Sequence, residues 1–422
     1  MGQVDLSPQN FYTLDDIDLT GKRVLVRVDY NSPINPFTGE LLSDFRIKAT
    51  INTLLDLSEA AVVLISHQSR PGKEDFISLY PHFEKLREFL LGREVRFIPD
   101  VIGPTALREI ERLKKGEILL LDNVRFLSEE MLDEKPERLS ETNFVRRLSK
   151  HFDFFVNDAF ACVHRAHSSM VAFPYKLPSV IGRLMERELS VVNQMLYGLS
   201  GTRVLILGGA KPKDRVNVID YMLSHGRNNY FLLLGGILGK IFLAAKARNL
   251  PKGIRTEVEK YPEEINKAKT IVKKYGDRIM VPDDFALKKG NERVEMDLKE
   301  IEDQTPLDIG SKTVERYSDM IKQADLVFIN GPLGLIEDPI FMKGTSQILR
   351  AIIGSKCVKI AGGGHISAIV EIEGLMNKFD HVSTGGGSML YLLSGKKPLS
   401  LEVLQRDVQR KLHPKCFRRS TS

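Results

Sequence analysis

The stretch PSVIGRLMERELSVVNQML, residues 178–196, divides the chain into two halves of different character. Pro178 and Ser179 are typical of a helix N-terminus, where backbone N–H groups lack partners. Apolar residues then recur at steps of three and four, which places them on one helical face. They are Ile181, Met185, Leu189, Val192 and Leu196. We therefore predict one helix that joins a half rich in Arg and His motifs to a half rich in glycine clusters.

The bulk composition is that of a globular protein with more than one domain. At 422 residues the chain is too long for one comfortable core. No apolar run reaches the length of a membrane span, and the N-terminus lacks the basic and apolar regions of a leader. Three cysteines, far apart, argue against a disulfide framework or a zinc site. We expect a cytoplasmic protein without a membrane partner, and the net charge of +6 suits anionic small molecules.

In the first half, short β-branched apolar stretches alternate with amphipathic ones. We predict strands at 24–28, 62–66, 95–98, 118–121 and 154–156, and helices at 45–57, 79–90 and 105–114. Strands that alternate with helices predict a parallel sheet covered on both faces. Ligands of such a sheet bind at the carboxyl ends of its strands.

Basic and polar residues follow four of these strands directly. The first strand runs into Asp29, Tyr30 and Asn31, and later strands run into residues 66–70, 122–125 and 157–167. Several Arg and His residues are therefore expected at one edge of the sheet. Guanidinium groups bind phosphate and carboxylate oxygens through paired hydrogen bonds, so this edge predicts a site for a small, highly anionic molecule. Nucleic-acid binding would more usually add interleaved aromatics or a continuous basic helix.

Glycine follows every predicted strand of the second half. The strands are 204–207, 231–234, 326–329, 358–361 and 381–384, and each runs into a turn that contains one to three glycines. Glycines let backbone N–H groups approach phosphates, and a following helix N-terminus adds a favourable dipole. Five such turns at one sheet edge predict a nucleotide. The dinucleotide fingerprint GxGxxG is missing, and GGILGK lacks the first glycine of a Walker A loop.

The segments RVLVRVDYNSPI, SDFRI, ISHQSRP, LLLDNVRF and VNDAFACVHRAHSS resemble the successive signatures of the phosphoglycerate kinase family. The resemblance runs in order over residues 20–395, which is more specific than any single motif. SHQSRPGKEDF and GGGH resemble the archaeal branch most. The resemblance implies reversible phosphoryl transfer from 1,3-bisphosphoglycerate to ADP, giving 3-phosphoglycerate and ATP.

The resemblance assigns the 3-phosphoglycerate site to the first half. The implied substrate-binding residues are Asp29, Tyr30, Asn31, Arg46, His67, Gln68, Ser69, Arg70, Arg125, His164 and Arg165. Asp122 replaces the family's usual glutamate before NVRF, and we expect it to serve the structure only. We expect Cys162 to be a small buried residue, because direct phosphoryl transfer needs no protein nucleophile.

The resemblance assigns the nucleotide to the second half. The implied residues are Lys211, Arg215, Gly235, Gly236, Asn330, Glu337, Gly363, Gly364, His365, Ile366, Gly385 and Gly386. Among them Lys211 follows the transferring phosphate and Glu337 binds the ribose, and Arg46 and Lys211 are the expected catalytic residues. Arg215 stands where many relatives carry a second lysine, and His365 stands where they carry aspartate. Neutral histidine is a poor ligand for Mg²⁺, so we expect the nucleotide rather than the protein to hold the metal.

These observations predict two doubly wound parallel-sheet α/β domains joined by a hinge helix. The expected limits are 1–180 for the first domain, 181–200 for the hinge helix and 201–395 for the second domain. Residues 396–422 are expected to return to the first domain and to end in a loose basic tail, HPKCFRRSTS. Arg46 and Lys211 would meet only when the hinge closes and excludes water.

The expected partners are 3-phosphoglycerate and ATP or ADP, without nucleic acid, for a monomer or homodimer. Two other functions fit parts of the sequence. A nucleotide-dependent dehydrogenase or ligase could use a similar sheet, but the missing GxGxxG weighs against it. A protein that senses anions or binds nucleic acid would suit the basic charge, and it would bind polyanions in a salt-dependent way without turnover.

Overall fold

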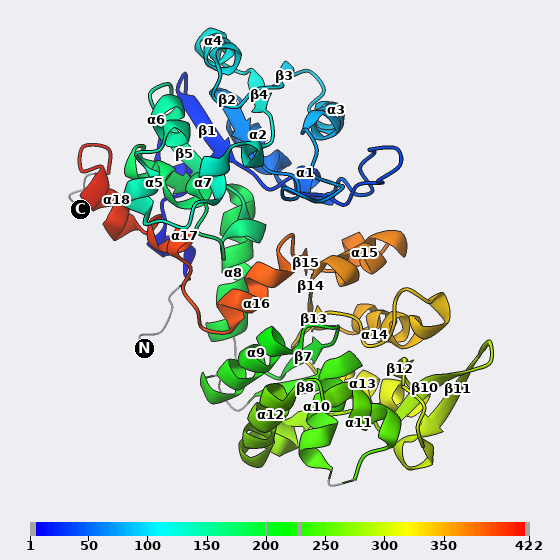
Figure 1. Ribbon diagram of the computed structural model, residues 1–422. Coiled ribbons are helices and arrows are strands. Elements are labelled where there is room, and N and C mark those ends of the chain that lie inside the picture. Colours follow the sequence, from blue (N-terminus) through cyan, green and yellow to red (C-terminus); the bar gives the residue numbers. More distant parts are fainter. Residues whose placement is uncertain (1–5, 199–200, 226–228, 248, 418–422) are drawn as a thin grey trace. The chain divides into compact units, whose positions relative to one another are not determined.

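The chain forms two units in the computed structural model, which describes residues 6–198, 201–225, 229–247 and 249–417 (Figure 1). The first unit is Met1–Asn193 together with Lys397–Ser422, and the second is Gln194–Lys396. The segment after Lys397, with helices α17 (Leu399–Glu402) and α18 (Arg406–Leu412), therefore belongs with the N-terminal half of the chain.

A six-stranded parallel sheet organises the first unit. Its spatial order is β3 (Val95–Ile98), β4 (Ile118–Leu121), β2 (Ala61–Ile65), β1 (Arg23–Arg27), β5 (Phe154–Asn157) and β6 (Ser179–Ile181). The helices are α1 (Phe45–Ala49), α2 (Ile51–Asp56), α3 (Tyr80–Phe89), α4 (Pro104–Arg112), α5 (Pro136–Leu139), α6 (Asn143–Ser149) and α7 (Ser168–Val171). Side chains alternate along each strand, so Leu25 and Val24 enter separate apolar clusters on the two sides of the sheet.

A second six-stranded parallel sheet organises the second unit. Its order is β15 (His381–Val382), β14 (Val358–Gly362), β13 (Leu326–Asn330), β7 (Arg203–Leu207), β8 (Tyr230–Leu234) and β9 (Ile279–Met280). From β7 the chain adds β8 and β9 on one side of the sheet, and it then adds β13, β14 and β15 on the other side. The carboxyl ends of β7 and β13 therefore form a topological switch point, where ligands of such sheets bind. The predicted pair of doubly wound sheets is confirmed.

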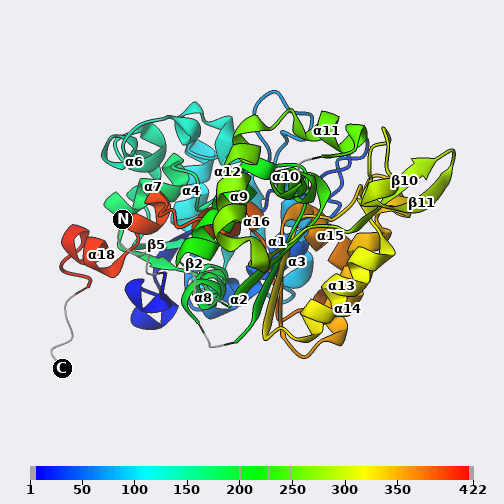
Figure 2. The same cartoon turned by 90° about the horizontal axis from the view of Figure 1, so that it is seen from below.

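Helices cover both faces of this second sheet. They are α9 (Pro212–His225), α10 (Gly236–Lys246), α11 (Lys252–Val258), α12 (Pro262–Tyr275), α13 (Ser311–Lys322), α14 (Lys343–Gly354), α15 (Gly364–Ile372) and α16 (Gly386–Leu393). Figure 2 shows α9, α10 and α12 grouped together, with α13 and α14 side by side elsewhere in the unit. Residues of α13, α14 and α15 share one buried apolar cluster with β7 and β13.

A small antiparallel sheet in the second unit was not predicted. It consists of β11 (Glu292–Asp297), β10 (Asp284–Lys289) and β12 (Asp308–Ile309). The strand β11 is rich in charge and has no fully buried residue, so its sequence carries little of the apolar alternation that identifies strands. Its pairing with β10 across a two-residue turn, Gly290–Asn291, defines it instead.

The stretch at 178–196 is only partly helical, so the prediction that Pro178 and Ser179 open a helix is wrong. Residues Ser179–Ile181 form β6, in which Val180 pairs with Val156 of β5. Helix α8 covers Arg183–Tyr197 rather than 181–200, of which residues 199–200 lie outside the described part. Pairing with the neighbouring strand β5 outweighs the local sequence preference for a helix start, because helix propensity alone is a weak determinant of structure.

Asp158 fixes the start of α8 from outside the helix. Its carboxylate accepts a hydrogen bond from the Met185 N–H at 3.0 Å and another from the Thr53 hydroxyl at 2.7 Å. Side-chain oxygens at this position satisfy N–H groups that have no partner within the helix. The apolar face of α8 is buried as predicted, including Leu189 and Val192.

The predicted loose tail is wrong for residues 413–417. The His413 ring nitrogen Nε2 lies 2.8 Å from the backbone oxygen of Pro174. The Phe417 side chain is buried and stacks on Tyr12 with ring centroids 4.0 Å apart. Stacking of the buried Phe417 ring on Tyr12 stabilises this segment, although the residues around it are basic. Residues 418–422 lie outside the described part of the chain.

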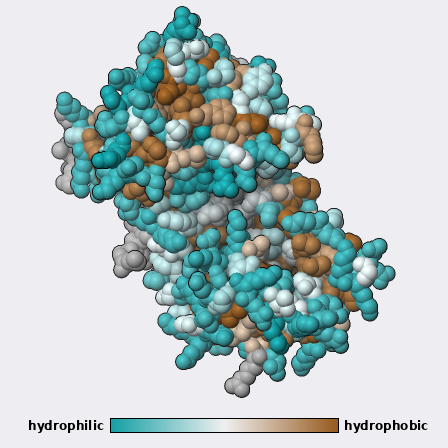
Figure 3. Space-filling view, viewed as in Figure 1, coloured by the Kyte–Doolittle hydropathy of each residue, from teal (hydrophilic) through white to brown (hydrophobic). Residues whose placement is uncertain are grey.

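Within the described ranges, no helix is long and apolar enough to cross a membrane. Hydrophilic side chains cover most of the visible face of each unit, and hydrophobic ones form only small groups there (Figure 3).

Candidate functional site

In the first unit, Arg and His side chains converge at the carboxyl ends of four neighbouring strands. Asp29 follows β1, His67 follows β2, Arg125 follows β4 in the short helix η3 (Val124–Phe126), and Arg165 follows β5. Arg46 lies on α1, where it forms an ion pair with Asp29. We call Arg27, Asp29, Arg46, His67, Arg125 and Arg165 the cationic cluster. Its strands β4, β2, β1 and β5 are adjacent in the sheet, which brings these ends together.

His67 lies at the centre of the cationic cluster and is 2% exposed. Burial lowers its pKa well below the ordinary range, and the charges of Arg27, Arg125, Arg165 and Arg46 lower it further. An Arg27 guanidinium nitrogen lies 3.1 Å from His67 Nδ1. Because guanidinium can only donate, Nδ1 accepts and the proton of this neutral ring resides on Nε2. His67 is therefore a neutral donor within a strongly positive site.

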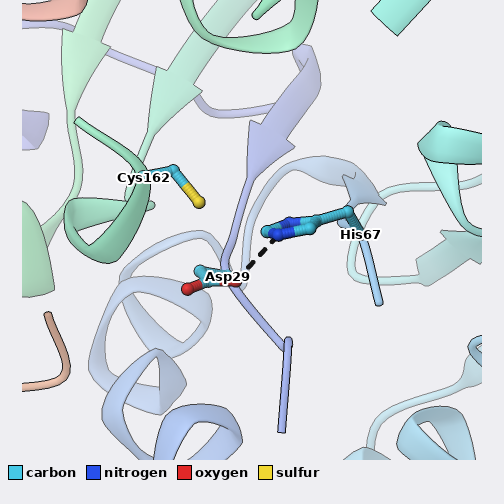
Figure 4. A group of neighbouring side chains, drawn as sticks. All are labelled: Asp29, His67 and Cys162. Carbon is cyan, nitrogen blue, oxygen red and sulfur yellow. Dashed lines mark ion pairs between the residues drawn. The ribbon is translucent and has the colours of Figure 1, made fainter. Parts of the chain in front are cut away.

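Asp29, His67 and Cys162 offer three potential metal-ligand atoms that all lie within 4.8 Å of one another (Figure 4). The surrounding charges oppose a cation there. Asp29 is already paired with Arg46, and His67 Nδ1 is already occupied by Arg27. Burial raises the pKa of the Cys162 thiol to about 11, which keeps it protonated. The group therefore belongs to a site for anions.

The loop after β2 is held in a strained conformation beside the cationic cluster. Ser69 has a φ of +53°, in the left-handed region that non-glycine residues seldom adopt. Its N–H donates to Asn31 Oδ1 at 2.7 Å, and its carbonyl oxygen accepts from Arg125. These bonds tie the loops after β1, β2 and β4 to one another. The same hydrogen bonds therefore hold Ser69 in its strained conformation and position the side chains of this edge.

Several predicted substrate residues face away from the cationic cluster. The Tyr30 ring is fully buried in the core, with its hydroxyl 3.1 Å from Thr50 Oγ1, because consecutive residues after β1 point to opposite sides. Gln68 is buried and bridges Ser32 and His82. The Tyr30 N–H also donates to Ser66 Oγ at 2.9 Å, so Tyr30 supports the loops of this edge from inside.

The other residues predicted near this edge lie on its surface or support it. Arg70 and His164 are exposed, and Arg165 donates to His164 Nε2 at 3.3 Å. Asp122 accepts from the Leu79 N–H at 2.8 Å and the Ser78 hydroxyl at 3.0 Å, so it supports the start of α3.

Arg27, at the end of β1, was not among the predicted site residues and is only 1% exposed. Its guanidinium contacts His67 and donates to Ser169 Oγ at 2.7 Å. The missed signal was a charged residue within an otherwise apolar strand, RVLVRV. A charged residue is buried only when it has hydrogen-bonding or charged partners. Here those partners are His67 and Ser169, which lie at the ligand edge of the sheet.

In the second unit, a pocket of about 230 Å³ opens at the topological switch point. Its walls include Gly209 after β7, Gly236 after β8 and Pro332 after β13. Glu337 and His365 also line it, and both are exposed. Apolar side chains, including Ile237, Leu307, Leu333 and Leu335, form much of the remaining surface, which also includes Lys240, Glu257 and Asp308. A concave apolar surface with a few polar groups is the usual form of a nucleotide-base site.

Unpaired donors gather where β13 and β14 end. Asn330 is 1% exposed, and its Nδ2 has no partner within the described chain. Arg215 donates to Asn330 Oδ1 at 3.2 Å and to the Lys211 carbonyl oxygen at 2.9 Å, while its own Nε is buried and likewise lacks a partner among described atoms. Burial lowers the pKa of Arg215. Buried donors that lack acceptors are costly, so they indicate a ligand with acceptor oxygens.

The predicted phosphate turns approach one another closely. A Cβ atom on Gly386, at the start of α16, would lie 2.1 Å from the backbone nitrogen of Gly363. Gly363 itself has a φ of +97° and precedes α15. The two helix N-termini are therefore brought together only because both turns lack side chains. Lys211 is exposed before α9, and the side chain of Ile366 lies in the core, which leaves only its backbone for a ligand.

Replacing Gly386 with alanine should weaken ADP binding by about tenfold or more, because overpacking costs about 1–3 kcal/mol. Gly354→Ala is the matched control, since a Cβ there meets no atom within 4 Å and Gly354 lies at the end of α14. Calorimetric titration with ADP measures both. Equal affinities would show that the approach of Gly386 to Gly363 does not shape the site.

Comparison with known proteins identifies the family. The family model described as "Phosphoglycerate kinase" matches residues 14–396. Phosphoglycerate kinase of Methanococcus maripaludis is 42% identical over 412 residues, covering 95% of this chain and 99% of the relative. The enzyme of Methanothermus fervidus is 39% identical over 399 residues, covering 94% and 97%.

Solved structures agree with these relatives. Phosphoglycerate kinase from Pyrococcus horikoshii OT3 superposes with a TM-score of 0.86 at 33% identity, covering 95% of this chain and all of that one. Together with the archaeal relatives, this match confirms both the predicted family and its predicted archaeal character. The chain therefore belongs to the phosphoglycerate kinase family, kinases that transfer a phosphoryl group reversibly from 1,3-bisphosphoglycerate to ADP, giving 3-phosphoglycerate and ATP.

Proposed function

We propose that the cationic cluster of the first unit binds 3-phosphoglycerate. The observation that carries this assignment is the convergence of four arginines on His67, since their charges all lower its pKa. Arg125 and Arg165 suit the phosphate of the substrate, and Asp29 and Asn31 suit its hydroxyl group. The neutral His67 offers an Nε2–H donor without adding charge. Arg46 acts in catalysis, where it neutralises charge on the transferring phosphoryl group.

The nucleotide binds to the second unit. The pocket beside Gly236 takes the base, Glu337 binds the ribose, and the turns at Gly363 and Gly386 bind phosphate oxygens through backbone N–H groups. The unpaired donors of Asn330 and Arg215 support this assignment. Lys211 follows the phosphate that is transferred. ATP and ADP are the nucleotide substrates, as in the family.

Mg²⁺ is held mainly by the nucleotide phosphates and water. Lys211 and Arg215, assigned to the phosphates, can only donate, and the amide oxygen of Asn330 already accepts from Arg215. When bound, Mg²⁺ neutralises charge on the phosphates. The protein groups bind and orient the nucleotide around it.

Replacing His365 with aspartate should tighten the binding of Mg²⁺-ADP relative to metal-free ADP. His365 is the second residue of α15 and lines the pocket, so a carboxylate there could provide the oxygen ligand that imidazole lacks. Calorimetric titration of both proteins with ADP, with and without Mg²⁺, measures the change. An identical metal dependence in the two proteins would exclude position 365 from metal handling.

Turnover is the direct test of these assignments. ATP and 3-phosphoglycerate should yield ADP and an acyl phosphate that hydroxylamine traps. Binding of 3-phosphoglycerate alone should be lost in Arg125→Ala and kept in Arg138→Ala, an exposed arginine on α5. Retained binding in Arg125→Ala would place the substrate elsewhere. We expect a cytoplasmic monomer or homodimer, and sedimentation distinguishes the two states.

A further inference from the structure

In addition to Asp308, Glu337 and His365, a partly buried ion pair lies among the apolar residues that line the nucleotide pocket. Lys240 on α10 and Glu257 on α11 both line it, and the Lys240 ammonium forms an ion pair with the Glu257 carboxylate. Lys240 is 6% exposed, and burial lowers its pKa. A buried lysine costs free energy unless it is well paired. An apolar residue of similar length could have filled the same wall, so the pair calls for an explanation.

Each partner keeps one hydrogen-bonding position open. The Lys240 ammonium has three N–H groups, of which one donates to Glu257 and one to the Pro306 carbonyl oxygen at 2.6 Å. In the part of the chain that the structure describes, the third N–H has no protein acceptor and the Glu257 Oε1 has no protein donor. The Glu257 side chain is 29% exposed, so it remains accessible from the pocket. One donor and one acceptor thus lie next to each other on a single wall.

The position of Lys240 and Glu257 suits contact with the edge of a purine base that points away from the ribose. Gly236 begins α10, and a Cβ on it would lie 3.1 Å from the Gly209 backbone nitrogen, at the glycines that follow β7. Lys240 comes one helical turn later, about 5–6 Å further along the axis. The apolar residues Ile237 and Leu333 line the same pocket. A purine whose ribose lies at Glu337 would direct its Watson–Crick edge away from the sugar.

We propose that Lys240 and Glu257 recognise the adenine edge of the nucleotide, with Lys240 donating to N1 and Glu257 accepting from the N6 amino group. This inference rests on the proposed binding of the nucleotide in the second unit. Adenine presents an acceptor at N1 beside a donor at N6, which complements one free N–H beside one free carboxylate oxygen. Hydrogen bonds to charged groups are the stronger ones, and a site built for them rejects analogues that lack the matching atom.

Two ATP analogues test the two contacts separately. Purine riboside triphosphate lacks the N6 amino group, and 1-deaza-ATP carries C–H in place of N1. With 3-phosphoglycerate as co-substrate, each should have a kcat/KM about 10-fold or more below that of ATP in the wild-type protein. Glu257→Leu should abolish the penalty for the first analogue only, and Lys240→Met should abolish it for the second only.

Each single variant leaves one charge buried without its partner and is therefore expected to be less stable. The double variant Lys240→Met/Glu257→Leu removes both charges, so a loss of stability does not confound the test. This variant should use all three nucleotides equally well. Glu263→Gln, at an exposed position of α12, is the control and should keep the wild-type preference. Wild-type protein that uses both analogues as well as ATP would overturn the proposal. A double variant that still discriminates would overturn it too.

Calorimetry separates this proposal from the proposed function. ADP and the diphosphates of the two analogues are titrated without 3-phosphoglycerate. If ADP binds more tightly than the analogues and the double variant removes that difference, the base contacts hold even in a protein without turnover. If none of the three binds, the nucleotide site itself is misassigned. If all three bind equally, only the base contacts are wrong.

Discussion

Replacing Arg46 with alanine should lower kcat by about 10²–10³, the usual loss when one preorganised charge-stabilising group is removed. Phosphoryl transfer depends on positioning and charge neutralisation rather than on a protein nucleophile, so a guanidinium that faces the transferring group acts mainly in the transition state. Arg46 is suited to this role because Asp29 holds it from one side while the side chain remains 27% exposed. The KM for 3-phosphoglycerate should change much less than kcat.

Steady-state kinetics in both directions measure this effect. Arg138→Ala removes a guanidinium from an exposed site on α5 and should leave kcat unchanged. A rise in KM with an intact kcat would make Arg46 a binding residue only. Asp29→Asn should give a smaller loss than Arg46→Ala, because it releases Arg46 from its partner without removing the charge.

Replacing Asp158 with alanine should lower the free energy of unfolding by about 2–4 kcal/mol, because it leaves buried donors without an acceptor. The carboxylate is fully buried and accepts from Thr53 on α2 and from the Met185 N–H in α8. Arg183, the first residue of α8, also donates its N–H to Thr53 Oγ1 at 2.9 Å. Denaturant unfolding measures the loss, and Asp133→Ala, at an exposed position, is the control.

The same residue predicts a pH dependence. Burial raises the pKa of Asp158 to about 6 in the folded protein, above its ordinary value of 3.8. The folded state therefore holds this proton more tightly than the unfolded state does. Its contribution to stability is fully present below pH 4 and is lost as the pH rises towards 6, by about 2–3 kcal/mol. Asp158→Asn should remove this part of the slope between pH 4 and 6, and an unchanged slope would contradict the raised pKa.

The sequence determined most strands of the two main sheets and the residues that follow them, but it did not predict the edge strands β6 and β9. Stretches such as Ile118–Leu121 are apolar throughout because both faces of a parallel strand are covered, and that pattern is local. The residues after each strand reach the same edge in any parallel sheet. Asp29, His67, Arg125 and the glycines after β7, β8 and β13 could therefore be assigned to two ligand sites from the sequence.

The tertiary structure decided what depends on partners distant in the chain. Ser179–Ile181 became a strand because β5 lay open beside it, and the start of α8 was set by Asp158. Tyr30 entered the core although it lies between two residues of the ligand edge. Arg27 and Lys240 were missed because a single charge in an apolar segment gives no information about what surrounds it. In the folded chain His67 lies beside Arg27, and Glu257 lies beside Lys240. Because a buried charge is costly without a partner, each of these contacts is needed once the side chain is buried.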